Sequence, residues 1–188
     1  SIIAGEDETL IFDITSFSSA SKNIDWLEWG YNRDGLDMPQ VNLGLVLSLH
    51  RHLPLFFKLF PGSINDVVTL KNLVSDVKSF GNKKSLFILD RGFYSENNIK
   101  ELSDENIDFI LPLPFSVNIG KGLISETNKD IENPANTKRF GGDIFYVLES
   151  DVNIGEVKAF GYVLYSKKRE ALETKSFYNR LIDIEYAL

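Results

Sequence analysis

The segment SLFILDRGFYS, residues 85–95, places an acid directly after a short apolar run. Residues 85–89 are almost wholly apolar, which is typical of a central strand covered on both faces. Asp90 and Arg91 follow at once. In α/β proteins the carboxyl ends of central strands are where ligands usually bind. The segment therefore predicts a buried strand that ends on a functional carboxylate.

Hydrophobic periodicity on both sides of this segment predicts an α/β fold. Period-two alternation predicts strands, and helical spacing predicts two helices, the second capped by Ser95. The predicted strands are 8–17, 41–49, 53–62, 85–89 and 107–114, and the predicted helices are 63–81 and 95–106. This order, with a hairpin early and strand–helix alternation later, implies a mixed sheet flanked by helices.

The second part of the chain has a different texture. Residues 115–142 are rich in Gly, Asn, Lys and Ser and are expected to be irregular. Two strand-like runs follow at 141–150 and 157–166, and then a charged helix begins at Lys167. We therefore expect an incomplete core over 1–115 and a β-rich insertion, with the start of a charged helix, over 116–188.

A second acid, Asp13, interrupts the first predicted strand on the face opposite its apolar side chains. If the two strands are neighbours, Asp13 and Asp90 converge, and two close carboxylates repel unless they share a proton or a cation. Oxygen ligands without His or Cys suit Mg²⁺ or Mn²⁺. Equally compatible with the residues alone, Asp13 binds a following Ser16 or Ser18, and Asp90 pairs with Arg91.

Composition limits the classes of protein. The chain has 188 residues, 43% hydrophobic content, no cysteine and a net charge of −7. These values fit a folded protein without disulfides or thiolate metal sites, and no apolar run reaches the length of a membrane span. A cytoplasmic, nucleoid-associated location is expected. The acidity argues against a dedicated nucleic-acid binder.

Four motifs carry a resemblance to a known family: DITSF at 13–17, GYNRDG at 30–35, PGS with an Asp at 61–66, and LDRGFYS at 89–95. In this order the chain resembles, over about residues 8 to 115, the DDE transposases of bacterial and archaeal insertion sequences, most closely the insertion-sequence-four family and its relatives. The resemblance implies a ribonuclease-H-like fold with a strand-rich insertion.

The same resemblance implies a function and a site. It makes Asp13 and Asp90 the first two catalytic acids, which hold two Mg²⁺ or Mn²⁺ ions. It implies DNA strand cleavage and strand transfer at insertion-sequence ends, by a homodimer that bridges two ends. The sequence gives no indication of the terminal repeats, the target preference or hairpinned ends.

The third acid departs from the family pattern. The family has a glutamate on a helix, preceded by Tyr and Arg at set spacings, but Tyr178, Arg180 and Glu185 do not reproduce those spacings. We therefore expect the third acid beyond Leu188, in a chain that is a fragment and inactive alone. Glu185 is the weaker alternative.

Further candidates accompany the acids. Arg33 and Arg91 are predicted to bind DNA phosphates and Tyr94 to stack on a base or sugar. Alternatively, Arg91 forms a structural ion pair, and Tyr94 packs at the rim of the core. His50 and His52 lack the companions of a metal site.

Two other functions are compatible with the same residues. A metal-dependent nuclease or phosphatase would use the same carboxylates on another substrate. A decayed transposase would be a non-catalytic interaction module.

Overall fold

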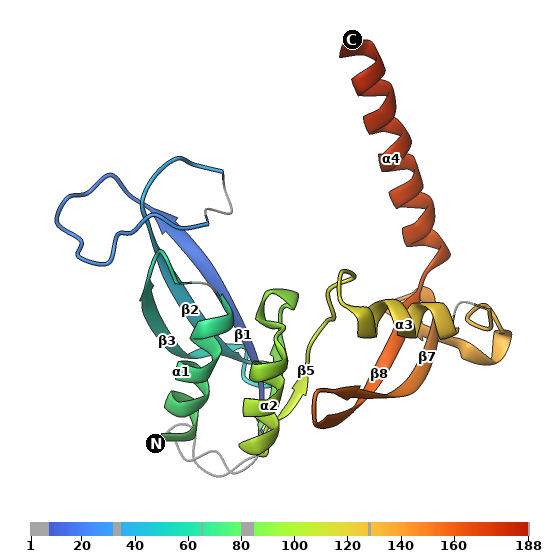
Figure 1. The fold of residues 1–188 in the computed structure, drawn as a ribbon, viewed down its shortest axis with the longest axis horizontal. Helices are drawn as coiled ribbons and strands as arrows, with labels where there is room; N and C mark the ends of the chain where they lie inside the picture. The colour runs from blue at the N-terminus through green and yellow to red at the C-terminus, as the bar shows by residue number, and fades with distance from the viewer. Residues whose placement is uncertain (1–7, 32–34, 65, 80–84, 128, 188) are drawn as a thin grey trace. The chain divides into compact units, whose positions relative to one another are not determined.

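The computed structural model describes residues 8–31, 35–64, 66–79, 85–127 and 129–187. The chain divides into two compact units, coloured along the sequence in Figure 1. The first comprises Ser1–Pro114 with Gly155–Val157, and the second comprises Phe115–Ile154 with Lys158–Leu188. Among the helices that the structure describes, none has both the length and the apolar character to cross a membrane.

A five-stranded mixed sheet forms the first unit, in the order β3-β2-β1-β4-β5. The pairs β1–β2 and β2–β3 are antiparallel, and the pairs β1–β4 and β4–β5 are parallel. This topology confirms the mixed, ribonuclease-H-like sheet expected from the sequence. The strands are β1 (Glu8–Ser18), β2 (Gln40–Ser48), β3 (Leu53–Pro61), β4 (Ser85–Leu89) and β5 (Asp108–Ile110).

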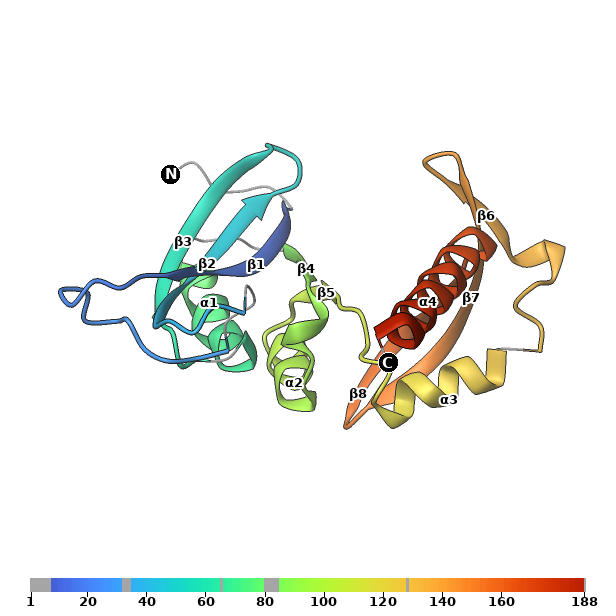
Figure 2. The same cartoon turned by 90° about the horizontal axis from the view of Figure 1, so that it is seen from above.

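Two helices cover one face of this sheet, as Figure 2 shows. They are α1 (Asp66–Ser79) and α2 (Glu96–Asp104). The alternation of β1 and β4 directs their large apolar side chains to this face, where they pack with the helices. The buried cluster includes Leu10, Phe12, Ile14, Leu70, Leu73, Val74, Phe87, Leu89, Phe93 and Leu102.

The opposite face of the sheet carries a row of aliphatic side chains. Leu47 pairs with Ile11, Ile11 with Ile88, and Ile88 with Ile110, so that the row crosses four strands. Ile110 is 54% exposed. On this face Leu86 and Ile88 of β4 are half-buried, whereas Ser85, Phe87 and Leu89 on the helical face are buried, so β4 is covered less fully on this face than on the other.

β5 is shorter than the predicted strand 107–114 and ends at Ile110. Pro112 and Pro114 follow. Proline has no backbone N–H to donate to a neighbouring strand, so pairing stops before the first of them.

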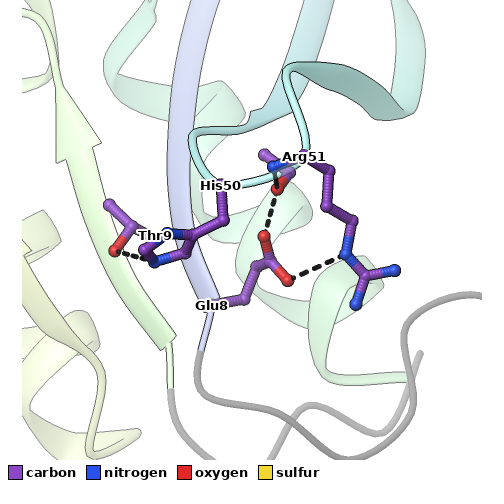
Figure 3. Close-up of polar contacts among 5 residues, drawn as sticks. Glu8, Thr9, His50 and Arg51 are labelled. Atoms are coloured by element: carbon purple, nitrogen blue, oxygen red, sulfur yellow. Dashed lines mark hydrogen bonds and ion pairs between the residues drawn. The ribbon is translucent and has the colours of Figure 1, made fainter.

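A buried acid, Glu8, stabilises the amino end of β1, the central strand of the sheet (Figure 3). The side chain of Glu8 accepts a hydrogen bond from the Ser48 hydroxyl and lies 3.3 Å from Nε of Arg51. The backbone N–H of Arg51 donates to the Ser48 hydroxyl at 3.0 Å. Glu8 is only 5% exposed, so these partners replace its lost hydration and fix the β2–β3 turn against β1.

Glu8→Ala is expected to lower the free energy of unfolding by about 2–3 kcal/mol, because it removes the ion pair with Arg51 and the acceptor of the buried Ser48 hydroxyl. Urea denaturation followed by circular dichroism measures this loss. Glu8→Gln keeps an acceptor for Ser48 and removes only the charge, and should cost about 1 kcal/mol. A Glu8→Gln variant as stable as the parent would contradict a role for the ion pair.

The second unit contains a three-stranded sheet, in the order β6-β7-β8, and two helices. Its elements are α3 (Asn118–Thr127), η2 (Pro134–Asn136), β6 (Thr137–Phe140), β7 (Asp143–Ile154), β8 (Val157–Tyr165) and α4 (Lys167–Ala187).

The expectation of an irregular segment over 115–142 is wrong, because α3, η2 and β6 lie within it. Gly120 and Gly122 weaken the helical signal of α3 in the sequence. Packing compensates: Leu123 is 7% exposed, and a Cβ placed on Gly161 would lie 3.0 Å from its Cδ1. The helix is therefore stabilised by its contact with β8 rather than by its own propensity.

Candidate active site

The two acids singled out by the sequence lie on neighbouring strands. Phe12 of β1 and Leu89 of β4 are Cα partners in a parallel pair. Asp13 directly follows Phe12, and Asp90 directly follows Leu89. Because neighbouring strands are about 4.8 Å apart, their Cα atoms lie about 5 Å from each other.

Both carboxylates belong to the same face of the sheet. Phe12 and Leu89 are buried beneath the helices, at 1% and 3% exposure. Asp13 and Asp90 follow them in extended backbone, with φ −77° and ψ 160° at Asp90, and both are exposed. Alternation therefore points the two acids away from the helical layer, toward the face that carries the aliphatic row.

Local structure explains why β4 ends on Asp90. Its Oδ1 accepts a hydrogen bond of 2.5 Å from the backbone N–H of Arg91 and caps the short helix η1 (Arg91–Phe93). Phe93 is 1% exposed, and its ring centroid lies 4.9 Å from that of Phe12. The buried ring anchors the turn, and the cap sets the direction of the carboxylate.

Asp13 has a similar local partner. Its Oδ1 accepts a hydrogen bond of 2.8 Å from the backbone N–H of Ile14. The Ser16 hydroxyl instead donates to Asn42 at 2.9 Å. The alternative partners considered from the sequence, Ser16 or Ser18 for Asp13 and the Arg91 guanidinium for Asp90, do not appear among the contacts of these two acids within the described residues. Neither acid forms an ion pair within those residues.

This arrangement fits a divalent cation. Two exposed carboxylates side by side, without a neutralising Lys or Arg among the described residues, repel each other and attract a positive ion. Their donors are all oxygen, the type that Mg²⁺ and Mn²⁺ prefer. The described residues bring no third acid or His into a metal-binding group with them.

Of the three residues predicted to bind DNA, the structure describes Arg91 and Tyr94. Arg91 is exposed in η1, and Tyr94 is half-buried just after it. Burial and the nearby charge of Glu96 raise the pKa of Tyr94, so its hydroxyl keeps its proton at neutral and mildly alkaline pH. Arg33 lies outside the described residues.

Other residues are not brought to the two acids. His50 lies at the opposite end of β1, where Nε2 is 3.5 Å from the Thr9 hydroxyl (Figure 3). His52 occupies the β2–β3 turn with a positive φ of 54°. Glu185 is exposed on α4 in the second unit.

A polar network near the carboxyl end of β1 was not predicted from the sequence. Gln40 and Asn42 are buried on the helical side of β2, and Asn42 Nδ2 donates to the carbonyl of Ile64 at 3.0 Å. The signal in the sequence is the spacing of QVNLG at 40–44, which puts two amides and Gly44 on one face of a strand. Asn42 thus holds the segment that follows β3, and Gln40 holds the loop that follows β1, because its Nε2 donates to the carbonyl of Tyr31 at 2.9 Å.

Comparisons with known proteins were made at the level of families, sequences and structures. The family described as "Transposase DDE domain" matches residues 4–185. No curated protein matches the chain.

The similar solved structures include the piggyBac transposase synaptic complex with hairpin DNA, at 12% identity, 83% coverage of this chain and a TM-score of 0.45. They also include the simian T-cell lymphotropic virus intasome with PP2A regulatory subunit B56 gamma, at 13% identity, 71% coverage and a TM-score of 0.40. The Drosophila P element transposase strand transfer complex has 15% identity, 73% coverage and a TM-score of 0.29.

The chain spans 32%, 47% and 31% of the lengths of those three chains. The family match, in contrast, runs through nearly the whole sequence, from before β1 to the last turns of α4. On this ground the chain belongs to the family of transposase DDE domains.

Proposed function

We propose that this chain is the catalytic domain of a DNA transposase that cleaves DNA strands and transfers them at the ends of an insertion sequence, in a metal-dependent reaction. The observation that carries the proposal is the parallel pairing of β1 with β4, which sets Asp13 beside Asp90 on one exposed face. Membership of the family supports it.

Asp13 and Asp90 would hold Mg²⁺ or Mn²⁺, with Asp13 as the ligand shared by two ions and Asp90 as a ligand of one. When bound, such ions would supply Lewis-acid activation of a water or 3′-hydroxyl and charge stabilisation for the departing oxygen. The backbone N–H groups of Ile14 and Arg91 hold one oxygen of each carboxylate and so orient the other. The exposed Arg91 guanidinium would orient a DNA phosphate.

A third acid completes the proposed site, and two positions are open for it. The spacing around Tyr178 and Arg180 supports an acid beyond Leu188. The family match, which reaches residue 185, supports Glu185 on α4.

Glu185→Gln separates these two positions. If Glu185 is the third acid, the variant is expected to lose strand cleavage, whereas Asp183→Asn on the same exposed helix should keep it. If the acid lies beyond Leu188, the chain of 188 residues neither cuts nor transfers DNA, and both variants resemble the parent. Cleavage of labelled insertion-sequence ends in Mg²⁺ measures this.

Manganese binding tests the core of the proposal. Electron paramagnetic resonance of free Mn²⁺ is expected to lose signal when the chain is added, and the loss should disappear in Asp90→Asn, because one of the two close carboxylates has become neutral. Asp108→Asn on β5, an exposed acid of the same sheet, is the matched control and should bind as the parent does. Binding unaffected by Asp90→Asn contradicts the site.

Substrate choice separates the rival functions. Metal-dependent hydrolysis of a small phosphate ester without cleavage of DNA ends would favour a phosphatase, and cleavage of any DNA without strand transfer would favour a nuclease. Metal binding without either activity in the full-length protein would favour a non-catalytic relic. A homodimer bridging two ends is proposed on the resemblance alone, and sedimentation with paired ends tests it.

A further inference from the structure

The helix α4 begins with three basic residues at an end where positive charge is unfavourable. Lys167, Lys168 and Arg169 occupy its first turn. The amino end of a helix carries a partial positive charge, so acids rather than bases stabilise it. A sequence that breaks a local rule in this way is expected to gain a compensating contact elsewhere in the fold.

Acids from two other parts of the second unit supply this contact. Lys167 Nζ lies 2.5 Å from Oε2 of Glu132, in the segment between α3 and η2. Lys168 Nζ lies 2.7 Å from Oδ1 of Asp143, the first residue of β7. Successive residues of a helix point about 100° apart, so the two ion pairs hold α4 from two directions. We call these two ion pairs the clasp.

Aromatic side chains of the same sheet support the clasp. Lys167 Nζ lies 5.9 Å from the centroid of the Tyr146 ring, and this ring stacks on that of Tyr165 with the centroids 6.0 Å apart. The Tyr165 hydroxyl donates to Glu170 at 2.5 Å, and this hydrogen bond raises the pKa of Tyr165 to about 12. The first turn of α4 is therefore joined to both β7 and β8.

The rest of α4 is not packed on its own sheet. A single residue, Ser166, separates β8 from α4, and its hydroxyl accepts the N–H of Arg169 at 3.4 Å, which fixes where the helix begins. Every described residue of α4, from Lys167 to Tyr186, is exposed, and Figure 1 shows the helix leaving the end of β8 alone. Within the described part of the second unit, the direction of α4 therefore depends on contacts of its first turn.

The length of α4 makes its direction important. Glu185 follows Lys167 by 18 residues, which is about 27 Å along a helix. A tilt of about 10° at the first turn would displace Glu185 by about 5 Å over this length. A displacement of about 1 Å in an active site can lower the rate about 100-fold. Both positions open for the third acid, Glu185 and a residue after Leu188, are reached through α4.

We propose that Lys167 and Lys168 are positioning residues, whose clasp fixes the direction of α4 on its sheet and thereby the place of the third acid. This role rests on the proposed function, because it requires α4 to carry that acid or to lead to it. A single exposed ion pair adds little to stability, so the clasp acts on the direction of the helix and not on folding.

Spin labels measure this direction, because the chain has no cysteine and two can be introduced where they are needed. Labels at Asn179→Cys on α4 and Asp151→Cys on β7, both exposed positions, are expected to give a narrow distance distribution by double electron–electron resonance. Lys167→Ala combined with Lys168→Ala should widen this distribution about twofold. Circular dichroism should show no loss of helix, because removal of cations from the amino end favours the helix.

Three controls assign the effect to the clasp. Lys175→Ala, an exposed lysine of the same helix without an ion pair among the described residues, should leave the distribution unchanged. Lys168→Asp alone should widen it, and Lys168→Asp combined with Asp143→Lys should restore the narrow distribution. In about 1 M salt, where the Debye length is about 3 Å, the distribution of the parent should widen as well.

Cleavage of insertion-sequence ends tests the positioning role in the protein that carries all three acids. Lys167→Ala combined with Lys168→Ala should lower kcat about 100-fold and leave KM for the ends nearly unchanged, since these lysines are paired with acids of the chain. The charge exchange between Lys168 and Asp143 should retain the parental kcat.

Three results would overturn the positioning role. They are an unchanged distance distribution in the double alanine variant, cleavage at the parental rate despite a widened distribution, and a raised KM with the parental kcat, which would assign the lysines to DNA phosphates instead. The proposed function fails separately, through normal cleavage by Asp13→Asn, because the distance distributions require neither DNA nor a metal ion.

Discussion

Asp13→Asn is expected to reduce metal-dependent strand cleavage by about 1,000-fold or more in the protein that carries all three acids. Asparagine keeps the size of the side chain and an oxygen that can accept the hydrogen bond of 2.8 Å from Ile14 N–H. It removes the negative charge that a cation requires beside Asp90. Single-turnover cleavage of radiolabelled insertion-sequence ends, at saturating Mg²⁺, measures the loss.

Stability provides the control for this variant. Because Asp13 is exposed and has no described ion-pair partner, Asp13→Asn should unfold at the same urea concentration as the parent, or at a higher one if repulsion from Asp90 is relieved. Asp108→Asn should leave both cleavage and stability unchanged. An Asp13→Asn protein that folds normally and still cleaves at the parental rate would falsify the assignment of the site.

Phe93→Ala is expected to produce the largest loss of stability, about 3–5 kcal/mol in the free energy of unfolding. Phe93 is 1% exposed, and its ring packs 4.9 Å from that of Phe12. Its removal leaves a cavity beneath η1 and also frees the turn that holds Asp90. Chemical denaturation in guanidinium chloride measures the stability, and the cleavage assay should show a loss as well.

Phe115→Ala is the matched control for this deletion, because Phe115 is 72% exposed. It should change the free energy of unfolding by less than about 0.5 kcal/mol. Similar effects of the two alanine variants would mean that the 89–95 turn does not depend on its buried ring.

Much of the core was predictable because its signals are local. The alternation in β1, the apolar run of β4 and the cap at Ser95 each follow from neighbouring residues, and the structure has all three. The Ser95 hydroxyl accepts the N–H of Asn98 at 3.0 Å, as the cap requires. Whether Asp13 and Asp90 lie on neighbouring strands stayed open in the sequence, because the pairing of β1 with β4 joins residues far apart in the chain.

The rest depends on contacts between distant residues. α3 contains two glycines and is stabilised by Leu123 against Gly161, a contact that no local pattern reports. In the sequence the loop between β1 and β2 has only the character of an irregular polar segment. The close approach of Gly30 to Gly62, which are far apart in the chain, could not be predicted from it. The third acid could not be placed because the residues around Tyr178 do not follow the family spacing.

The aliphatic row on the face of the two acids has a consequence for handling the protein. Each square ångström of apolar surface left in water forgoes about 25 cal/mol, so the exposed Ile110, together with the half-buried Leu47, Ile11 and Ile88, favours association. Purified chains should take up a hydrophobic dye such as ANS and precipitate as they are concentrated. Any ligand that covers these side chains should suppress both effects, which makes dye release a simple screen for ligands of this face.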